Sequence, residues 1–94
     1  MILSFADKHT EELFITGRSR RYSAQIVTRA LRKLRLIDSV ESLEEIRTPP
    51  GNRLETLSGD RADQHSIRIN NQWRICFEWK ADGAHNVEIN NHYA

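Results

Sequence analysis

Cysteine is scarce in this sequence: Cys76 is the only one among 94 residues. One thiol excludes an internal disulfide framework and a cysteine-rich zinc site, and it favours a reducing cytoplasm as the location. Long hydrophobic runs are absent as well, since no stretch approaches the roughly 20 apolar residues of a membrane span. The opening residues, MILSFADKHTEE, reach charged positions too early for a secretory signal. We therefore expect a cytoplasmic protein without a membrane segment.

Glycine is also sparse, with four residues scattered at expected turns. No glycine-rich phosphate loop is present, so we expect no small-molecule cofactor. The four histidines lack the spacing of metal ligands with a third partner, which argues against a metal site. A chain of this length builds one modest core, so residues 1–94 are expected to form a single domain.

Positive charge is abundant in one segment. The net charge is only +1, yet residues 17–35 contain seven basic residues and no acid. Eleven of the 14 basic residues are arginine, which holds phosphate through two parallel hydrogen bonds where lysine acts as a point charge. The bias hints at an anionic partner. A solvated helix face explains the same pattern, and the charge alone favours that simpler interpretation.

Hydrophobic spacing predicts two helices in the first half. The first covers about 8–16, with Asp7 as its N-cap and Gly17 as its stop. The second begins near Ser19 or Ser23 and runs to about Ile37 with a 3.6-residue period. Its apolar positions are Tyr22, Ile26, Val27, Ala30, Leu31, Leu34 and Ile37, and the opposite face carries Arg29, Arg32 and Lys33.

The second half changes to a period of two. A short helix over Ser42–Ile46, with a capping box from Ser42 to Glu45, and a rigid turn at 48–52 precede the change. Together with the opening segment, the pattern predicts strands at 2–5, 53–57, 65–69, 73–79 and 85–89. The fold class is therefore α+β: a small antiparallel sheet in the order β-α-α-β-β-β-β, with helices packed on one face.

The apolar alternation also sets the register, because a one-residue slip would expose the buried face. A three-residue loop at 70–72 places Ile67 opposite Ile75. A loop of Ala81-Asp82-Gly83 places Trp79 opposite His85 and, further along, Phe77 opposite Val87. His65 falls on the same inner face as His85, and both histidines are interpreted as structural.

The other face of the sheet then carries chemistry-bearing side chains. Arg68 falls opposite Arg74, and an extended last strand brings His92 next to Gln72 and diagonal to Arg74. Like charges that face each other across strands repel, so the arginine pair requires a nearby carboxylate or an anionic ligand. Glu88 is a strand acid predicted on this face, but it lies nearer Cys76 than the arginine pair. We therefore interpret the face as an anion site; a salt-screened surface pair is the alternative.

A family resemblance is carried by two stretches, NRLETLSGDR at 52–61 and SIRINNQWRICF at 66–77. Together with the opening MILSFADKHTEELFITGRSRR, they resemble the HigB branch of the RelE/ParE superfamily of toxins over nearly the whole chain. The resemblance implies a RelE-like fold and a ribosome-dependent endoribonuclease that cuts mRNA in the ribosomal A site. It also implies a HigA-like helix-turn-helix antitoxin, which neutralises the toxin and brings the complex to operator DNA.

Metal-free RNA cleavage needs a base for the 2′-hydroxyl, a cation at the phosphorane and an acid for the leaving oxygen. We assign phosphate stabilisation to Arg74 and Arg68, and proton transfer to His92, with Tyr93 as a second candidate for a proton transfer. Glu55 is a lower-ranked candidate for a second base, because nothing in the sequence fixes its face. The residues expected to bind RNA are Arg53, Arg61, Gln72, Arg29, Arg32 and Lys33.

The C-terminus leaves alternative functions open. Relatives commonly end in a pattern like E-I-V-D-Y-H, whereas residues 88–94 read EINNHYA, so tyrosine and histidine are exchanged. This order is compatible with a catalytically impaired homologue that acts as an antitoxin-bound co-repressor. A non-enzymatic RNA- or ribosome-binding module is a further alternative.

Overall fold

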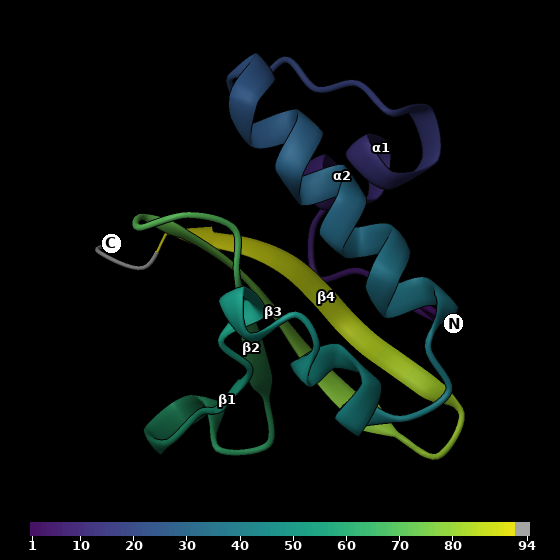
Figure 1. Ribbon diagram of the computed structural model, residues 1–94. Helices are drawn as coiled ribbons and strands as arrows, with labels where there is room; N and C mark the ends of the chain where they lie inside the picture. Colours follow the sequence, from purple (N-terminus) through teal and green to yellow (C-terminus); the bar gives the residue numbers. More distant parts are fainter. Residues whose placement is uncertain (92–94) are drawn as a thin grey trace.

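The computed structural model of the chain describes residues 1–91. Its helices are α1 (Lys8–Thr16) and α2 (Ala24–Ser39), its 3-10 turns are η1 (Leu43–Arg47), η2 (Pro50–Asn52) and η3 (Gly59–Arg61), and its strands are β1 (Glu55–Thr56), β2 (His65–Arg68), β3 (Trp73–Lys80) and β4 (Gly83–Asn91). The strands form one antiparallel sheet in the order β1-β2-β3-β4. Figure 1 shows α1 and α2 on the same side of this sheet, which confirms the predicted α+β class.

The opening segment runs beside β4, as two isolated bridges rather than a continuous strand. Ile2 bridges Ala84 and Phe5 bridges Val87, both in the parallel sense. The approach is close at Gly83, where an added Cβ would lie 2.3 Å from the carbonyl oxygen of Met1. Glycine is therefore required where the chain turns into β4.

Helix ends follow the local signals in the sequence. The carboxylate of Asp7 accepts a hydrogen bond from the backbone N–H of Thr10 at 2.7 Å, and Gly17 ends α1 in the left-handed conformation with φ 74°. Ser23 caps α2, which extends two residues beyond the predicted end. The third predicted helix is the 3-10 turn η1, and its capping box joins Ser42 to Glu45.

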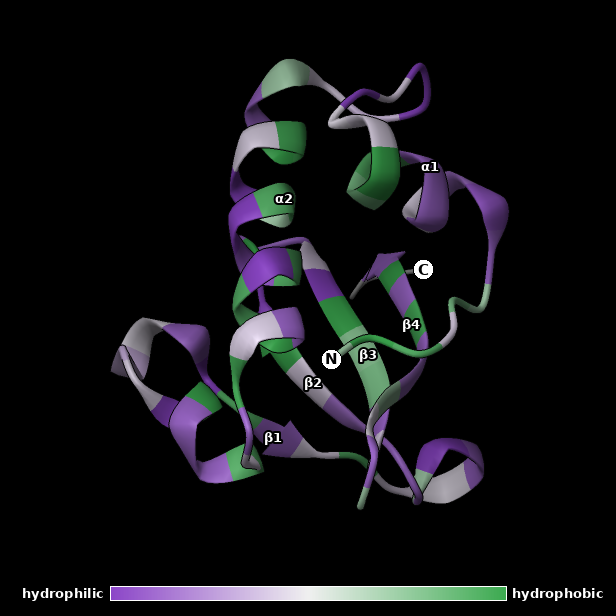
Figure 2. Cartoon of the chain, turned by 90° about the vertical axis from the view of Figure 1, so that its right-hand side faces the viewer, coloured by the Kyte–Doolittle hydropathy of each residue, from purple (hydrophilic) through white to green (hydrophobic). Residues whose placement is uncertain are grey.

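The core lies between α2 and the sheet. Ile26, Ala30, Leu34 and Ile37 are the buried residues of α2, and they follow the predicted period. Figure 2 shows hydrophobic colouring on the side of this helix that is turned inward and hydrophilic colouring on its outer side. The opposing residues of the sheet include Ile67, Ile75, Phe77 and Ile89. With this face committed to the helices, the other face of the sheet is left for side chains of the site.

The register of β2 and β3 is the predicted one. Ile67 pairs with Ile75 and Arg68 pairs with Arg74. The turn at 70–72 is held by Asn70, whose side-chain oxygen accepts hydrogen bonds from the backbone N–H groups of Gln72 and Trp73, each at 2.8 Å. The outer-face position of both arginines thus follows from the hydrophobic alternation.

The predicted register of the β3–β4 hairpin is wrong near its turn. The turn has two residues rather than three, so Trp79 pairs with Ala84 and Glu78 pairs with His85. His85 therefore faces outward with Glu78, not inward as predicted. A β-bulge restores the register beyond this point: Asn86 adopts the left-handed conformation with φ 52° between the two paired regions.

The predicted strand at 53–57 is reduced to Glu55 and Thr56. Arg53 adopts φ 47° at the end of η2, and this left-handed residue is incompatible with an extended strand. The turn directs the backbone carbonyl of Arg53 toward the sheet, which matters for the site described next.

Candidate active site

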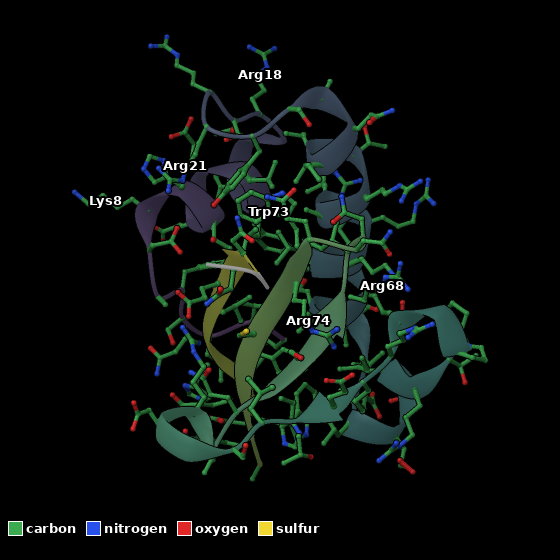
Figure 3. The ribbon with its side chains drawn as sticks, turned by 90° about the vertical axis from the view of Figure 1, so that its left-hand side faces the viewer. Lys8, Arg18, Arg21, Arg68, Trp73 and Arg74 are labelled. Atoms are coloured by element: carbon green, nitrogen blue, oxygen red, sulfur yellow. The ribbon has the colours of Figure 1, made fainter. Side chains whose placement is uncertain are left out.

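A pocket of about 420 Å³ opens on the sheet face opposite the helices. Its lining residues come from the η3 region and from strands β2, β3 and β4: Leu57, Arg61, Ser66, Arg74, Cys76, Asn90 and Asn91. Figure 3 looks onto this side of the sheet and shows Arg74 near its middle. The pocket lies on the face that the alternation assigned to the chemistry-bearing residues.

Arg74 is held rigidly at the floor of the pocket. Its Nε donates to the Ser66 hydroxyl at 2.8 Å and its Nη2 donates to the backbone carbonyl of Arg53 at 2.9 Å. Only 9% of the residue is exposed. These bonds orient the guanidinium, and with it a positive charge, at the pocket that the residue lines.

Glu55 partly balances this charge from β1. Its carboxylate lies 3.7 Å from Nη2 of Arg74, and 55% of its side chain is exposed. Glu55 pairs with Ser66 across β1 and β2, which fixes it on the pocket face. The sequence had left this face undetermined, because it depends on where β1 docks rather than on local alternation.

Arg61 forms a second charged group at the pocket wall. Its Nη1 donates to the carboxylate of Glu88 at 2.6 Å and to the side-chain oxygen of Gln64 at 2.7 Å. The hydrogen bond from Arg61 to Glu88 raises the pKa of the guanidinium above its usual value. Cys76 lines the same pocket and pairs with Glu88 across β3 and β4, and its burial raises the pKa of the thiol. A thiol in that state is a poor nucleophile, so the pocket offers cations rather than a reactive sulfur.

Arg68 turns away from Arg74 toward α2. Its Nη2 donates to the side-chain oxygen of Asn71. Lys33 on α2 donates to Asn52, a buried residue that itself donates to the backbone carbonyls of Ile46 and Thr48. The pKa of Lys33 is lowered, first by burial and then by the charges of Arg29, Arg32 and Arg68.

Arg29, Arg32, Lys33 and Arg68 thus form one surface, which we call the α2 cationic surface. No acid is among the groups that shift the pKa of Lys33. Arg29 and Arg32 are exposed, and Arg29 borders a hollow over the start of α2. A polyanion that spans these like charges would reduce the repulsion between them.

The remaining predicted residues lie in different places. The side chain of Arg53 is exposed, while its backbone carbonyl supports Arg74. Gln72 is exposed at the tip of the β2–β3 turn. His92 and Tyr93 lie outside the described residues; Asn91, which precedes them, lines the pocket. Sequence reasoning did not nominate Ser66 or Asn90 as site residues; the observed register places both on this face, opposite Cys76 and Arg74.

No group of three or more metal-ligating side chains is found within residues 1–91. Over the same residues, no helix has the length and apolar content to cross a membrane. The described part of the site thus combines two guanidinium groups, Arg74 and Arg61, with the exposed carboxylate of Glu55 and the carboxylate of Glu88 that is paired with Arg61. Such a pocket suits a phosphodiester, since the guanidinium fork matches phosphate oxygens and a carboxylate accepts a proton.

Comparison with known proteins gives consistent matches. A family model described as "HigB-like toxin: RelE-like toxin of type II toxin-antitoxin system HigB" matches residues 3–94. A protein of Vibrio cholerae serotype O1 named "Toxin HigB-1" is 36% identical over 93 residues, which covers 98% of each chain. An uncharacterized protein of Haemophilus influenzae is 37% identical over 62 residues, or 66% of this chain and 56% of that protein.

Proposed function

Because the chain belongs to the HigB-like, RelE-like toxins of type II toxin–antitoxin systems, we propose that it is a ribosome-dependent endoribonuclease that cuts mRNA and so inhibits translation. The observation that carries this proposal is the pocket on the outer sheet face, with Arg74 at its floor and Arg61 at its wall. Both guanidinium groups are held in place by neighbouring residues, so the charge is arranged before the substrate binds.

The proposed reaction needs no metal. A base removes the proton of the 2′-hydroxyl, the 2′-oxygen attacks the phosphorus, and the bond from phosphorus to the 5′-oxygen breaks as that oxygen takes a proton from an acid. Arg74 stabilises the added negative charge on the phosphorane. Arg68, which the sequence had assigned the same role, turns toward α2 and is proposed to hold the flanking RNA backbone instead. We assign the two proton transfers to His92 and Tyr93. Glu55 is the second candidate for the base, since its carboxylate borders Arg74 on the pocket side.

A type II toxin has an antitoxin partner, and we propose that this partner is a HigA-like helix-turn-helix protein. The toxin would reach operator DNA through that complex, and it would meet ribosomes and mRNA in the cytoplasm. Three groups of side chains are proposed to hold RNA: the α2 cationic surface, Arg61 at the pocket wall, and Arg53 and Gln72 at the exposed turns. No cofactor enters the reaction as we propose it.

A second function is favoured by a specific feature of Arg74. Its guanidinium is almost fully buried and bonded to Ser66 and to the carbonyl of Arg53. These contacts also suit a purely structural arginine in a toxin homologue that has lost catalysis and serves as an antitoxin-bound co-repressor. The exchanged order of His92 and Tyr93 is compatible with the same alternative.

Controlled expression separates the two functions. We expect induction of the chain without its antitoxin to arrest growth within one generation, with mRNA cut inside coding regions. Co-expression of the antitoxin should restore growth. Normal growth with intact mRNA, together with operator binding by the toxin–antitoxin complex alone, would instead establish the co-repressor.

The α2 cationic surface makes a separate prediction. Removing two phosphate contacts with Arg29→Ala and Arg32→Ala together should weaken ribosome binding and reduce the slope of log affinity against log salt by about two. The affinity of labelled protein for purified ribosomes is measured at several salt concentrations between about 50 and 200 mM, where phosphate contacts weaken strongly. Arg47→Ala is the control, because Arg47 is exposed on η1 and pairs only with Glu44 among described residues. An unchanged slope in the double variant would exclude this surface as an RNA contact.

A further inference from the structure

The loop between α1 and α2 is basic and ordered by its own side chains. The hydroxyl of Thr16 accepts a hydrogen bond from the backbone N–H of Arg18 at 3.1 Å, and the hydroxyl of Ser19 accepts one from the backbone N–H of Arg21 at 3.0 Å. Ser23 then caps α2. Arg21 is exposed, so its guanidinium is presented to solvent from a backbone that is already fixed.

An aromatic pair lies beneath this arginine. The guanidinium carbon of Arg21 lies 5.9 Å from the ring centroid of Tyr22. The Tyr22 ring in turn meets Trp73 edge-on, with centroids 5.4 Å apart and an interplanar angle of 81°. Both rings are half-buried. We call Arg21, Tyr22 and Trp73 the basic–aromatic ledge.

The ledge lies near the candidate active site along the chain, at the end of β3, but on the helix side of the sheet. Trp73 directly precedes Arg74 in β3 and pairs with Asn91, which lines the pocket. Its side chain points to the helix side of the sheet, so the ledge is reached over the end of β3. Figure 3 shows Trp73 between Arg74 and Arg21 in this view. A chain bound at Arg74 would meet the ledge when it continues past the end of the sheet.

The chemistry of the ledge fits one nucleotide. Arginine planes and tyrosine rings are surfaces on which unpaired bases stack, and the guanidinium also binds phosphate. Burial raises the pKa of the Tyr22 hydroxyl, and Asp7 and Glu88 add to this effect, while Arg21 opposes it. The hydroxyl is therefore protonated at neutral pH and able to donate. Both nearby acids are engaged, Asp7 with Thr10 and Glu88 with Arg61.

We propose that the basic–aromatic ledge is a second RNA subsite, where an unpaired nucleotide next to the scissile phosphate stacks on Arg21 and Tyr22. The subsite is distinct from Arg74 and from the α2 cationic surface on the other side of the pocket. This proposal rests on the proposed ribonuclease function. It specifies that the mRNA is single-stranded on this side of the cleavage point, and that the base of the bound nucleotide is not stacked on its neighbours in the mRNA.

A double-mutant cycle tests the subsite on ribosome-bound mRNA, with one change made in the mRNA and the other in the protein. One change replaces single nucleotides on either side of the cleavage point by abasic nucleotides, and the other is Arg21→Ala. We expect one abasic position to slow cleavage by wild type about tenfold, within the range that a single base–aromatic stack supplies. Arg21→Ala should cut intact mRNA about tenfold more slowly than wild type. The abasic nucleotide should not slow this variant further, since both changes remove the same contact.

Two controls keep the outcome decisive. Arg20→Ala removes an equal charge from the same loop and should remain within about twofold of wild type. Tyr22→Phe keeps the ring against Trp73 and should retain most of the sensitivity to the abasic position. The subsite is refuted if Arg21→Ala cuts like wild type, if Arg20→Ala costs as much as Arg21→Ala, or if the abasic nucleotide slows both proteins equally. If wild type does not cut intact mRNA on ribosomes at all, the result contradicts the proposed ribonuclease function rather than the subsite.

Discussion

Replacing Arg74 by alanine is expected to lower the rate of mRNA cleavage on purified ribosomes by about 100-fold to 1,000-fold. This is the range that loss of one oriented donor to a developing oxyanion produces. The substitution removes the buried guanidinium that lines the pocket, where the proposed phosphorane would gather its negative charge. Single-turnover cleavage of a defined message at saturating toxin measures the chemical step apart from ribosome binding.

The burial of Arg74 requires a matched structural control. Arg74→Ala leaves the Ser66 hydroxyl and the Arg53 carbonyl without this partner, so it also destabilises the fold by about 1–3 kcal/mol. Ser66→Ala removes one of these hydrogen bonds and keeps the charge. The Ser66→Ala variant should lose part of the thermal stability that Arg74→Ala loses, and it should retain most of the cleavage activity.

Arg74→Lys separates charge from geometry. Lysine keeps a positive charge but lacks the planar fork that donates to Ser66 and Arg53 together. We expect an activity between those of wild type and Arg74→Ala. If Arg74→Ala is folded and cuts at the wild-type rate, Arg74 is a structural residue, and another group must stabilise the phosphorane.

His92→Ala is expected to have the other large effect, a loss of about 100-fold to 10,000-fold in the same assay, because His92 is assigned one of the two proton transfers. Thermal stability should change little if the role is chemical. Imidazole added to the buffer should restore part of the activity of this variant, since the free base can act where the side chain is missing.

Tyr93→Phe is the partner experiment. It removes only a hydroxyl, and a loss of similar size would assign the second proton transfer to Tyr93. If Tyr93→Phe is unaffected while Glu55→Gln loses activity, Glu55 is the base, as its position beside Arg74 allows. Full activity in His92→Ala without imidazole would contradict the assignment of His92.

The α+β class could be predicted from the sequence because it depends on local periodicity. The 3.6-residue spacing from Ile26 to Ile37 marked the buried side of α2, and a period of two did the same for β2 and β3. Since alternation leaves one face for the core, it also placed Arg74 on the opposite face. These features can be predicted from the residues of a single helix or strand, because apolar side chains are buried away from water.

Three features depended on tertiary structure. The turn before β4 has two residues and a compensating bulge at Asn86. The opening segment also packs against Gly83 and leaves no room for a Cβ there. Glu55 reaches Arg74 only because β1 docks beside β2. Lys33 bonds to Asn52, a buried asparagine from η2, and its pKa is lowered in part by the charge of Arg68, which no local pattern signals.

The sequence by itself therefore determined which side of the sheet carries the arginines and which side is covered by helices. Only the tertiary structure decided how deeply Arg74 is held, which carboxylate balances it and where the pocket opens. The difference is physical: the faces of an element follow from backbone geometry repeated every few residues. A binding site instead requires side chains from distant segments, whose positions are set when the whole core packs at once.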